Sequence, residues 1–141
     1  ANIKKRQVKA PKIYVRDSGL VHALLAVENR KQLLSHPRLG ASWEGFIVEQ
    51  IIAVQGHRDV YFWRTQAGAE LDLLTFSRGR AIGYEIKVAD APRTTKSMRI
   101  ALADLGLHHL YVVYPGSKTY PLDERITCLG AKDLLRYASV A

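Results

Sequence analysis

Two neighbouring stretches of the sequence place acidic residues and a lysine at the spacing of a metal-dependent hydrolase. Glu70 and Asp72 are two residues apart in one apolar stretch, and Glu85 and Lys87 are two apart in the next. Residues two apart on a β-strand point to the same face of a sheet. Carboxylate oxygens are the ligands that Mg²⁺ and Mn²⁺ prefer, and these ions activate water for attack on phosphorus. The pattern predicts a Mg²⁺ or Mn²⁺ site suited to phosphodiester hydrolysis.

A tight turn between the two stretches brings these side chains together. Arg78-Gly79 suits the two-residue turn of a β-hairpin. Counting back from this turn, the facing pairs are Asp72 with Glu85 and Glu70 with Lys87. Two carboxylates directly opposite each other destabilise a sheet unless a positive charge lies between them. We therefore expect all four side chains on one face, with a metal ion held by the two facing carboxylates.

A third carboxylate, Glu44, lies on a predicted helix that has Ser42 as its N-cap and ends at Gly56. At about 100° per residue, Glu44 falls within the apolar arc of this helix, whereas Glu49 falls on the far side. We expect Glu44 to point inward and to assist at the metal, directly or through a water. A lysine beside such a site orients or helps to deprotonate the attacking water and offsets charge on the phosphate.

Each of these residues also has a purely structural explanation. Glu70 opposite Lys87 is an ordinary cross-strand ion pair, and Glu44 in a first helical turn is favoured by the helix dipole. A Glu-x-Lys triplet in a strand is common by chance. The combination of an inward helical Glu, an Asp facing a Glu across a hairpin and a lysine on the same face is nevertheless the spacing of the PD-(D/E)XK nuclease core. It predicts a restriction-endonuclease-like fold.

Hydrophobic periodicity predicts the elements that position these residues. The fold class is α/β (α+β), a mixed sheet flanked by helices in the order ααβββαββα. The expected elements cover residues 18–34, 42–55, 60–64, 69–76, 80–89, 95–105, 109–114, 125–129 and 131–137. Residues 1–12 are expected to form a basic linker or arm, and residues 13–141 a single domain.

The charge balance favours a polyanionic partner. The chain has 141 residues with 21 Lys and Arg against 13 Asp and Glu, a net charge of +8. DNA is the expected partner, and Arg64, Lys12 and Lys96 are candidate phosphate contacts. The alternatives are that Arg64 covers aromatic surface at the end of a strand and that Lys12 lies in a solvated linker.

Composition excludes several other classes of protein. A single cysteine, Cys128, excludes an internal disulfide and a cysteine-based zinc site. No apolar run approaches the roughly 20 residues that span a bilayer, and no signal peptide opens the chain. We therefore expect a cytoplasmic protein without membrane contact.

Several blocks of the sequence also resemble one family across almost the whole chain. They are residues 11–20 (PKIYVRDSGL), 39–46 (LGASWEGF), 61–65 (YFWRT), 69–72 (AELD) and 84–87 (YEIK). They resemble the C-terminal domain of unknown function that follows the ATPase module in predicted prokaryotic AAA-type ATPases. The resemblance implies a restriction-endonuclease-like fold, with Glu44, Asp72, Glu85 and Lys87 on the nuclease-like motif positions.

The same resemblance implies a P-loop ATPase and a winged-helix segment ahead of this domain. The chain contains no Gly-x-x-x-x-Gly-Lys-Ser/Thr motif, so it holds no nucleotide through a P-loop. It also begins with Ala1 rather than Met. We therefore expect the chain to be a fragment of a longer polypeptide, with its ATPase module as a partner.

Two alternatives to a nuclease stay open. In the first, the same fold binds DNA or a protein without turnover, and the acidic site is vestigial. In the second, the domain docks on its ATPase module or assembles a homo-oligomer, and an acidic surface on the partner matches the charge of +8.

Overall fold

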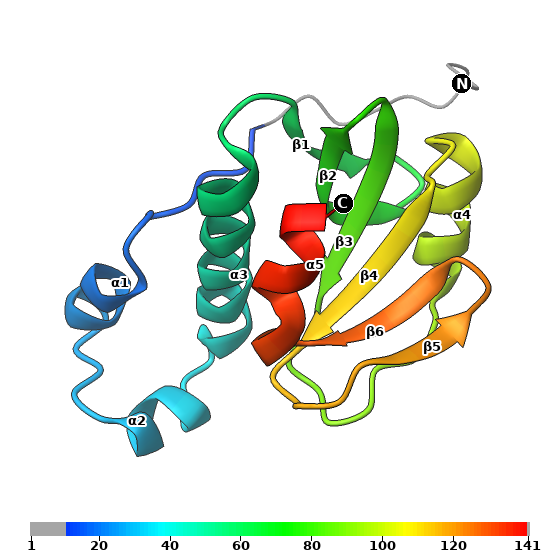
Figure 1. Cartoon of the computed structure of the whole chain (residues 1–141). Helices are drawn as coiled ribbons and strands as arrows, with labels where there is room; N and C mark the ends of the chain where they lie inside the picture. Colours follow the sequence, from blue (N-terminus) through cyan, green and yellow to red (C-terminus); the bar gives the residue numbers. More distant parts are fainter. Residues whose placement is uncertain (1–10, 141) are drawn as a thin grey trace.

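A six-stranded mixed sheet forms the centre of the computed structural model, which describes residues 11–140 (Figure 1). The predicted arm at residues 1–12 lies outside the described residues except for Pro11 and Lys12. The strand order is β1-β2-β3-β4-β6-β5. The strands are β1 (Val60–Arg64), β2 (Glu70–Ser77), β3 (Arg80–Ile86), β4 (His109–Tyr114), β5 (Tyr120–Asp123) and β6 (Ile126–Gly130).

Helices cover both faces of the sheet and so create two apolar cores. On one face α3 (Leu39–Gln55) and α5 (Leu134–Val140) pack on Leu73, Tyr84 and Val113. On the other face α4 (Lys96–Asp104) packs on a separate cluster. The remaining helices are α1 (Ser18–Leu24), α2 (Arg30–Ser35) and the 3₁₀-helix η1 (Ala131–Asp133). No helix within residues 11–140 combines the length and the hydrophobicity needed to cross a membrane.

The sheet combines an antiparallel half with a parallel half. Strands β1, β2 and β3 form an antiparallel meander, whereas β3, β4 and β6 run parallel. Parallel neighbours need a crossover connection, and α4 supplies it between β3 and β4. The predicted hairpin turn is confirmed: Ser77 pairs with Arg80, and Arg78 and Gly79 adopt φ of 49° and 75°. Such positive φ values are those of the turn that matches strand twist.

The predicted mixed sheet flanked by helices is confirmed, but the predicted element order is wrong at two places. The helix expected at residues 18–34 is divided into α1 and α2, because Ala26 adopts a φ of 53° and Asn29 caps a new helix. Strand β5 was not predicted, since it is short and contains Pro121. Proline lacks an N–H group and is tolerated in a strand at the edge of a sheet, where β5 lies.

The start of α3 and the end of β3 also differ from their predicted positions. Helix α3 begins at Leu39 with Arg38 as its N-cap, so the prediction of Ser42 as the cap is wrong. The Oγ atom of Ser42 instead lies 2.6 Å from Nε2 of His22. Strand β3 ends at Ile86 rather than at residue 89. By contrast, α4 begins where a helix was expected from residue 95: Thr95 is its N-cap, and its side chain accepts a hydrogen bond from the backbone N–H of Met98.

The predicted alternation of side chains along residues 70–76 is wrong. The pairing of β1 with β2 shifts by one residue between Tyr61 and Trp63, as in a β-bulge. Leu71 and Leu74, three residues apart, consequently lie in the same core cluster beneath α4. Leu73, between them, packs in the other cluster beneath α3. The irregularity changes the direction of the β2 side chains just where Asp72 lies.

Gly83 on β3 allows close packing of the core beneath α4. A Cβ atom at this position would lie 2.7 Å from Cδ1 of Leu107 and 3.2 Å from Cδ2 of Leu71. Both leucines are almost fully buried. The missing side chain therefore lets β3 approach its neighbours where the strand leads to Glu85.

Candidate functional site

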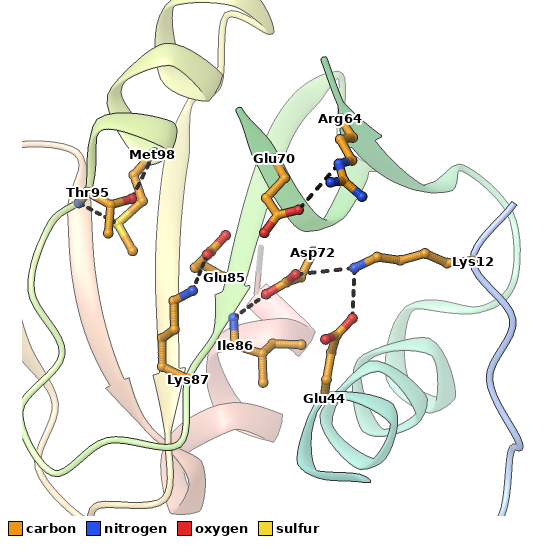
Figure 2. Close-up of polar contacts among 10 residues, drawn as sticks. All are labelled: Lys12, Glu44, Arg64, Glu70, Asp72, Glu85, Ile86, Lys87, Thr95 and Met98. Carbon is orange, nitrogen blue, oxygen red and sulfur yellow. Dashed lines mark hydrogen bonds and ion pairs between the residues drawn. The ribbon is translucent and has the colours of Figure 1, made fainter. Parts of the chain in front are cut away.

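Two buried carboxylates, Asp72 and Glu85, meet near the end of β3 (Figure 2). Their residues are 8% and 2% exposed, which is unusual for acidic residues. The pairing of β2 with β3 runs from Ser77 and Arg80 to Leu73 and Tyr84, so Asp72 and Glu85 come directly after the last pair. Instead of pairing through the backbone, Asp72 accepts a 2.8 Å hydrogen bond from the N–H of Ile86 through Oδ2.

A lysine from the start of the described chain lies among the carboxylates. Nζ of Lys12 lies 2.8 Å from Oε1 of Glu44 and 3.3 Å from Oδ1 of Asp72. The same ammonium group is 5.9 Å from the centre of the Phe62 ring. Tyr14 donates a hydrogen bond to Oε1 of Glu44. The predicted inward direction of Glu44 is thus confirmed, and Lys12 connects α3 to β2.

Glu85 and Lys87 form a second ion pair at the site. Nζ of Lys87 lies 2.6 Å from Oε1 of Glu85, whose side chain is almost completely buried. The other oxygen, Oε2, is buried and has no hydrogen-bond partner among the residues that the structure describes. A buried carboxylate oxygen without a partner is energetically costly, and a ligand or an ion can remove that cost.

Burial changes the acidity of both carboxylates. Burial raises the pKa of Asp72, an effect that the hydrogen bond from Ile86 opposes. Burial and the neighbouring charge of Asp72 raise the pKa of Glu85 to about 7. Both carboxylates therefore bind protons more readily than free carboxylates do, because burial disfavours their charged forms.

The two lysines at the site keep their charge at neutral pH. Burial alone would lower the pKa of Lys12, but the hydrogen bond to Glu44 and the charge of Asp72 raise it. For Lys87, burial is likewise outweighed by Glu85, and the pKa is raised. Each ammonium group therefore acts as a fixed positive charge rather than as a base.

The predicted contact between Glu70 and Lys87 is replaced by two other ion pairs. Glu70 lies 3.8 Å from Nε of Arg64, and Lys87 pairs with Glu85. The carboxylates of Glu70, Asp72 and Glu85 still point toward a common region in Figure 2. Lys96, the other predicted phosphate contact, is exposed at the first residue of α4.

The chemistry of the donor set fits a hard divalent cation with two protein ligands. Within residues 11–140, no group of three or more Asp, Glu, His or Cys side chains is close enough to hold one metal ion. Asp72 and Glu85 together offer two carboxylates, and Oε2 of Glu85 accepts no hydrogen bond from the described part of the chain. Mg²⁺ is commonly held by one or two carboxylates and keeps the rest of its shell for water and phosphate oxygens.

Tyr14 and the place of Lys12 at the site were not predicted from the sequence. Both contact Glu44 across about thirty residues of chain. Lys12 was predicted as a phosphate contact on a linker, whereas its ammonium group is partly buried against two acidic side chains. A pattern of alternating charge or hydrophobicity carries no information about such distant contacts, so no signal in the sequence identifies them.

Comparison with known proteins places this site within a family. The family model described as "Domain of unknown function (DUF4143)" matches residues 39–134, which include α3 and all six strands. The chain belongs to this family. All four predicted site residues, Glu44, Asp72, Glu85 and Lys87, lie within the matched part.

Two curated relatives resemble the chain over nearly all of its length. They are the uncharacterized proteins Rv2008c of Mycobacterium tuberculosis and Mb2031c of Mycobacterium bovis. Each is 48% identical over 140 residues, which cover 99% of this chain and 32% of the relative. The chain thus spans about a third of the length of these relatives. No solved structure matches it significantly.

Proposed function

We propose that this DUF4143 domain is a PD-(D/E)XK-type nuclease domain that cleaves DNA with the help of Mg²⁺ or Mn²⁺. The observation that carries the proposal is the buried pair of Asp72 and Glu85, with Lys87 2.6 Å from one oxygen of Glu85 and the other oxygen unpartnered. Two carboxylates that can hold a metal ion, with a lysine beside them, suit metal-dependent phosphodiester hydrolysis. The net charge of +8 suits a polyanionic substrate.

Asp72 and Glu85 are the residues that would hold the metal ion. A bound Mg²⁺ or Mn²⁺ supplies Lewis acidity toward a phosphoryl oxygen and lowers the pKa of water. Glu85 must lose its proton to act as a ligand, and its pKa of about 7 permits this near neutral pH. The hydrogen bond from Ile86 keeps the Asp72 carboxylate fixed in direction.

Lys87 has an electrostatic role in this proposal. Because its pKa is raised, the ammonium group keeps its proton and cannot accept one from water. It would instead stabilise the negative charge that develops on the phosphate when a water oxygen bonds to phosphorus, the bond to the leaving oxygen breaks, and the proton lost by the water reaches that leaving oxygen through solvent. Glu44 acts through its ion pair with Lys12, because it holds the positive ammonium group of Lys12 beside Asp72.

A second candidate function is a binding module with the same fold and no turnover. It is favoured by the position of Lys12, whose ammonium group contacts both Glu44 and Asp72 and offsets part of their negative charge. In this case the domain binds DNA through its positive charge, and binding weakens with salt but does not depend on Mg²⁺.

We also propose that the domain works beside an ATPase module of the same polypeptide. Support comes from the resemblance to the domain that follows the ATPase module in AAA-type ATPases. It also comes from the length of the curated relatives, of which this chain spans 32%. Contacts with that module or between copies of the chain are part of this proposal.

The deciding experiment is a cleavage assay on plasmid and branched DNA with Mg²⁺ or Mn²⁺ added to the chelator-treated protein. The variants are Asp72→Asn, Glu85→Gln and Lys87→Ala, and the matched control is Glu124→Gln, which neutralises an exposed carboxylate. We expect metal-dependent cleavage that falls on the order of 100-fold in Lys87→Ala and is unchanged in Glu124→Gln.

Cleavage that persists in all three variants would exclude the site as the catalytic one. Salt-sensitive DNA binding without cleavage, equal with and without Mg²⁺, would favour the binding module. Circular dichroism of every variant shows whether lost activity reflects lost folding.

A further inference from the structure

A second site of positive charge lies at the opposite end of β3 from Glu85. A hollow of about 550 Å³ opens between the β2–β3 turn, the beginning of β4 and the end of α5. In Figure 1 the C-terminal end of α5 points toward the end of the sheet that carries this turn. Arg80 opens β3, five residues before Glu85, which is about 17 Å along a strand. The hollow is therefore separate from the acidic site.

Positive side chains dominate the wall of this hollow. Arg78, Arg80 and Arg136 line it together with His108 and His109, and no carboxylate does. None of these three arginines forms an ion pair with an acidic side chain of residues 11–140. All three are exposed. Three guanidinium groups that line one hollow without an acidic ion-pair partner favour an anionic ligand, because such a ligand offsets their positive charge.

Aromatic rings form the inner side of the same hollow. The ring centres of His109 and Tyr111 are 4.7 Å apart. The ring of Tyr137 meets that of Tyr111 edge-on, with their centres 5.7 Å apart. All three side chains are half-buried, so each also faces the opening. Nε2 of His109 lies 2.8 Å from Oγ1 of Thr127, which fixes the ring. Burial, together with His108 and Arg125, lowers the pKa of His109, so the ring is uncharged at neutral pH.

We propose that this hollow binds a nucleoside phosphate, with the arginines on the phosphate and the aromatic rings against the base. The volume of about 550 Å³ is within the range of small-molecule sites. Guanidinium groups bind phosphate through paired hydrogen bonds, and bases stack on aromatic side chains. A free nucleotide and the terminal nucleotide of a strand present the same chemistry. The site requires no cleavage activity and does not depend on the proposed nuclease.

The test is binding to the purified chain, measured by calorimetry and by NMR. The probes are AMP, inorganic phosphate and a short oligonucleotide with a 5′-phosphate. We expect AMP to bind and to shift the resonances of His109 and Tyr111 but not those of Asp72. Arg80→Ala and Arg136→Ala should each weaken binding about tenfold, as expected for loss of a charge-assisted contact. Arg93→Ala removes the same charge at an exposed position outside the hollow and should change nothing.

Each outcome decides the proposal. Failure of AMP and of the oligonucleotide to bind, or binding that is unaffected by Arg80→Ala, would overturn it. Equal affinity for AMP and inorganic phosphate would overturn the role of the aromatic rings. Binding by AMP or by the oligonucleotide supports the site, and the tighter of the two identifies the source of the ligand. Asp72→Asn should leave AMP binding intact, so the failure of this site and the failure of the nuclease are distinguishable.

Discussion

The Asp72 carboxylate accepts a hydrogen bond of 2.8 Å from the backbone N–H of Ile86, on the neighbouring strand. The bond joins β2 to β3 where their regular pairing has already ended at Leu73 and Tyr84. It therefore continues the hairpin with a side chain in place of a backbone carbonyl. The same carboxylate also contacts Lys12, so one acidic group serves both the sheet and the candidate site.

Removal of this acceptor should be visible at a single amide. In Asp72→Ala the N–H of Ile86 is left without its partner, at a cost of about 1–3 kcal/mol. We expect amide hydrogen exchange at Ile86 to accelerate, as measured by NMR. Asp72→Asn, which retains an oxygen acceptor, should protect this amide better than Asp72→Ala. Equal exchange rates in the two variants would show that the bond contributes nothing.

The stability of the metal-free protein should fall as pH rises from about 4.5 to about 7. Unfolded Glu85 ionises near its ordinary pKa of 4.5, whereas folded Glu85 holds its proton up to about pH 7. Ionisation then favours the unfolded chain over this interval, and above it the penalty is constant. The difference between the folded and unfolded pKa of Glu85 corresponds to a loss of roughly 3 kcal/mol in the free energy of unfolding.

Glu85→Gln removes this titration and provides the measurement. Urea unfolding in the presence of a chelator should show that the stability of the variant relative to the original protein increases between pH 4.5 and about pH 8. Glu124→Gln, at an exposed site, should show no such trend. Parallel pH profiles for Glu85→Gln and the unchanged protein would contradict the raised pKa.

Lys12 should compete with a divalent cation. Its ammonium group lies 2.8 Å from Glu44 and 3.3 Å from Asp72, where it repels any second positive charge. Lys12→Met keeps an unbranched apolar side chain beside Phe62 and removes the charge. We expect Mn²⁺ to bind about tenfold more tightly to this variant, by calorimetry, since two unit charges about 4 Å apart in water interact by about 1 kcal/mol and tenfold corresponds to about 1.4 kcal/mol.

The matched control is Lys31→Met, which removes an exposed lysine from α2. Its Mn²⁺ affinity should equal that of the unchanged protein. An unchanged affinity in Lys12→Met as well would mean that Lys12 and the metal ion do not share the site.

Gly83→Ala should destabilise the fold. The new Cβ atom would lie 2.7 Å from Cδ1 of the buried Leu107, which is too close without movement. Overpacking of this kind costs about 1–3 kcal/mol, and urea unfolding measures it. Gly40→Ala is the opposite control, because its Cβ meets nothing within 4 Å on helix α3. For Gly40→Ala we expect the free energy of unfolding to increase by about 0.5–1 kcal/mol. Equal effects of the two substitutions would refute the packing explanation.

The features predicted correctly from the sequence depend on local signals. The turn at Arg78-Gly79 and the cap at Thr95 each involve residues within four positions of one another. Asp72 and Glu85 come directly after the last pair of that hairpin, in agreement with the count back from the turn. These relationships are set by backbone geometry over a few residues, so the pattern of residue types is enough to predict them.

The errors concern features that depend on distant contacts or on local irregularity. Strand β5 is short and contains a proline, and it exists because β6 offers it a partner. The shift between β1 and β2 reverses the alternation expected near Asp72. Lys12 meets Asp72 across 60 positions of the chain. None of these arrangements leaves a periodic signal in the sequence.

The separations between the site residues also bear on the order in which the site forms during folding. Asp72 and Ile86 are 14 residues apart, Lys12 and Glu44 are 32 apart, and Lys12 and Asp72 are 60 apart. The entropy lost on closing a loop grows with its length, so the hairpin contact is the least costly to form. Lys12 is then expected to join after the main folding barrier. Its removal should accelerate unfolding and leave the folding rate nearly unchanged.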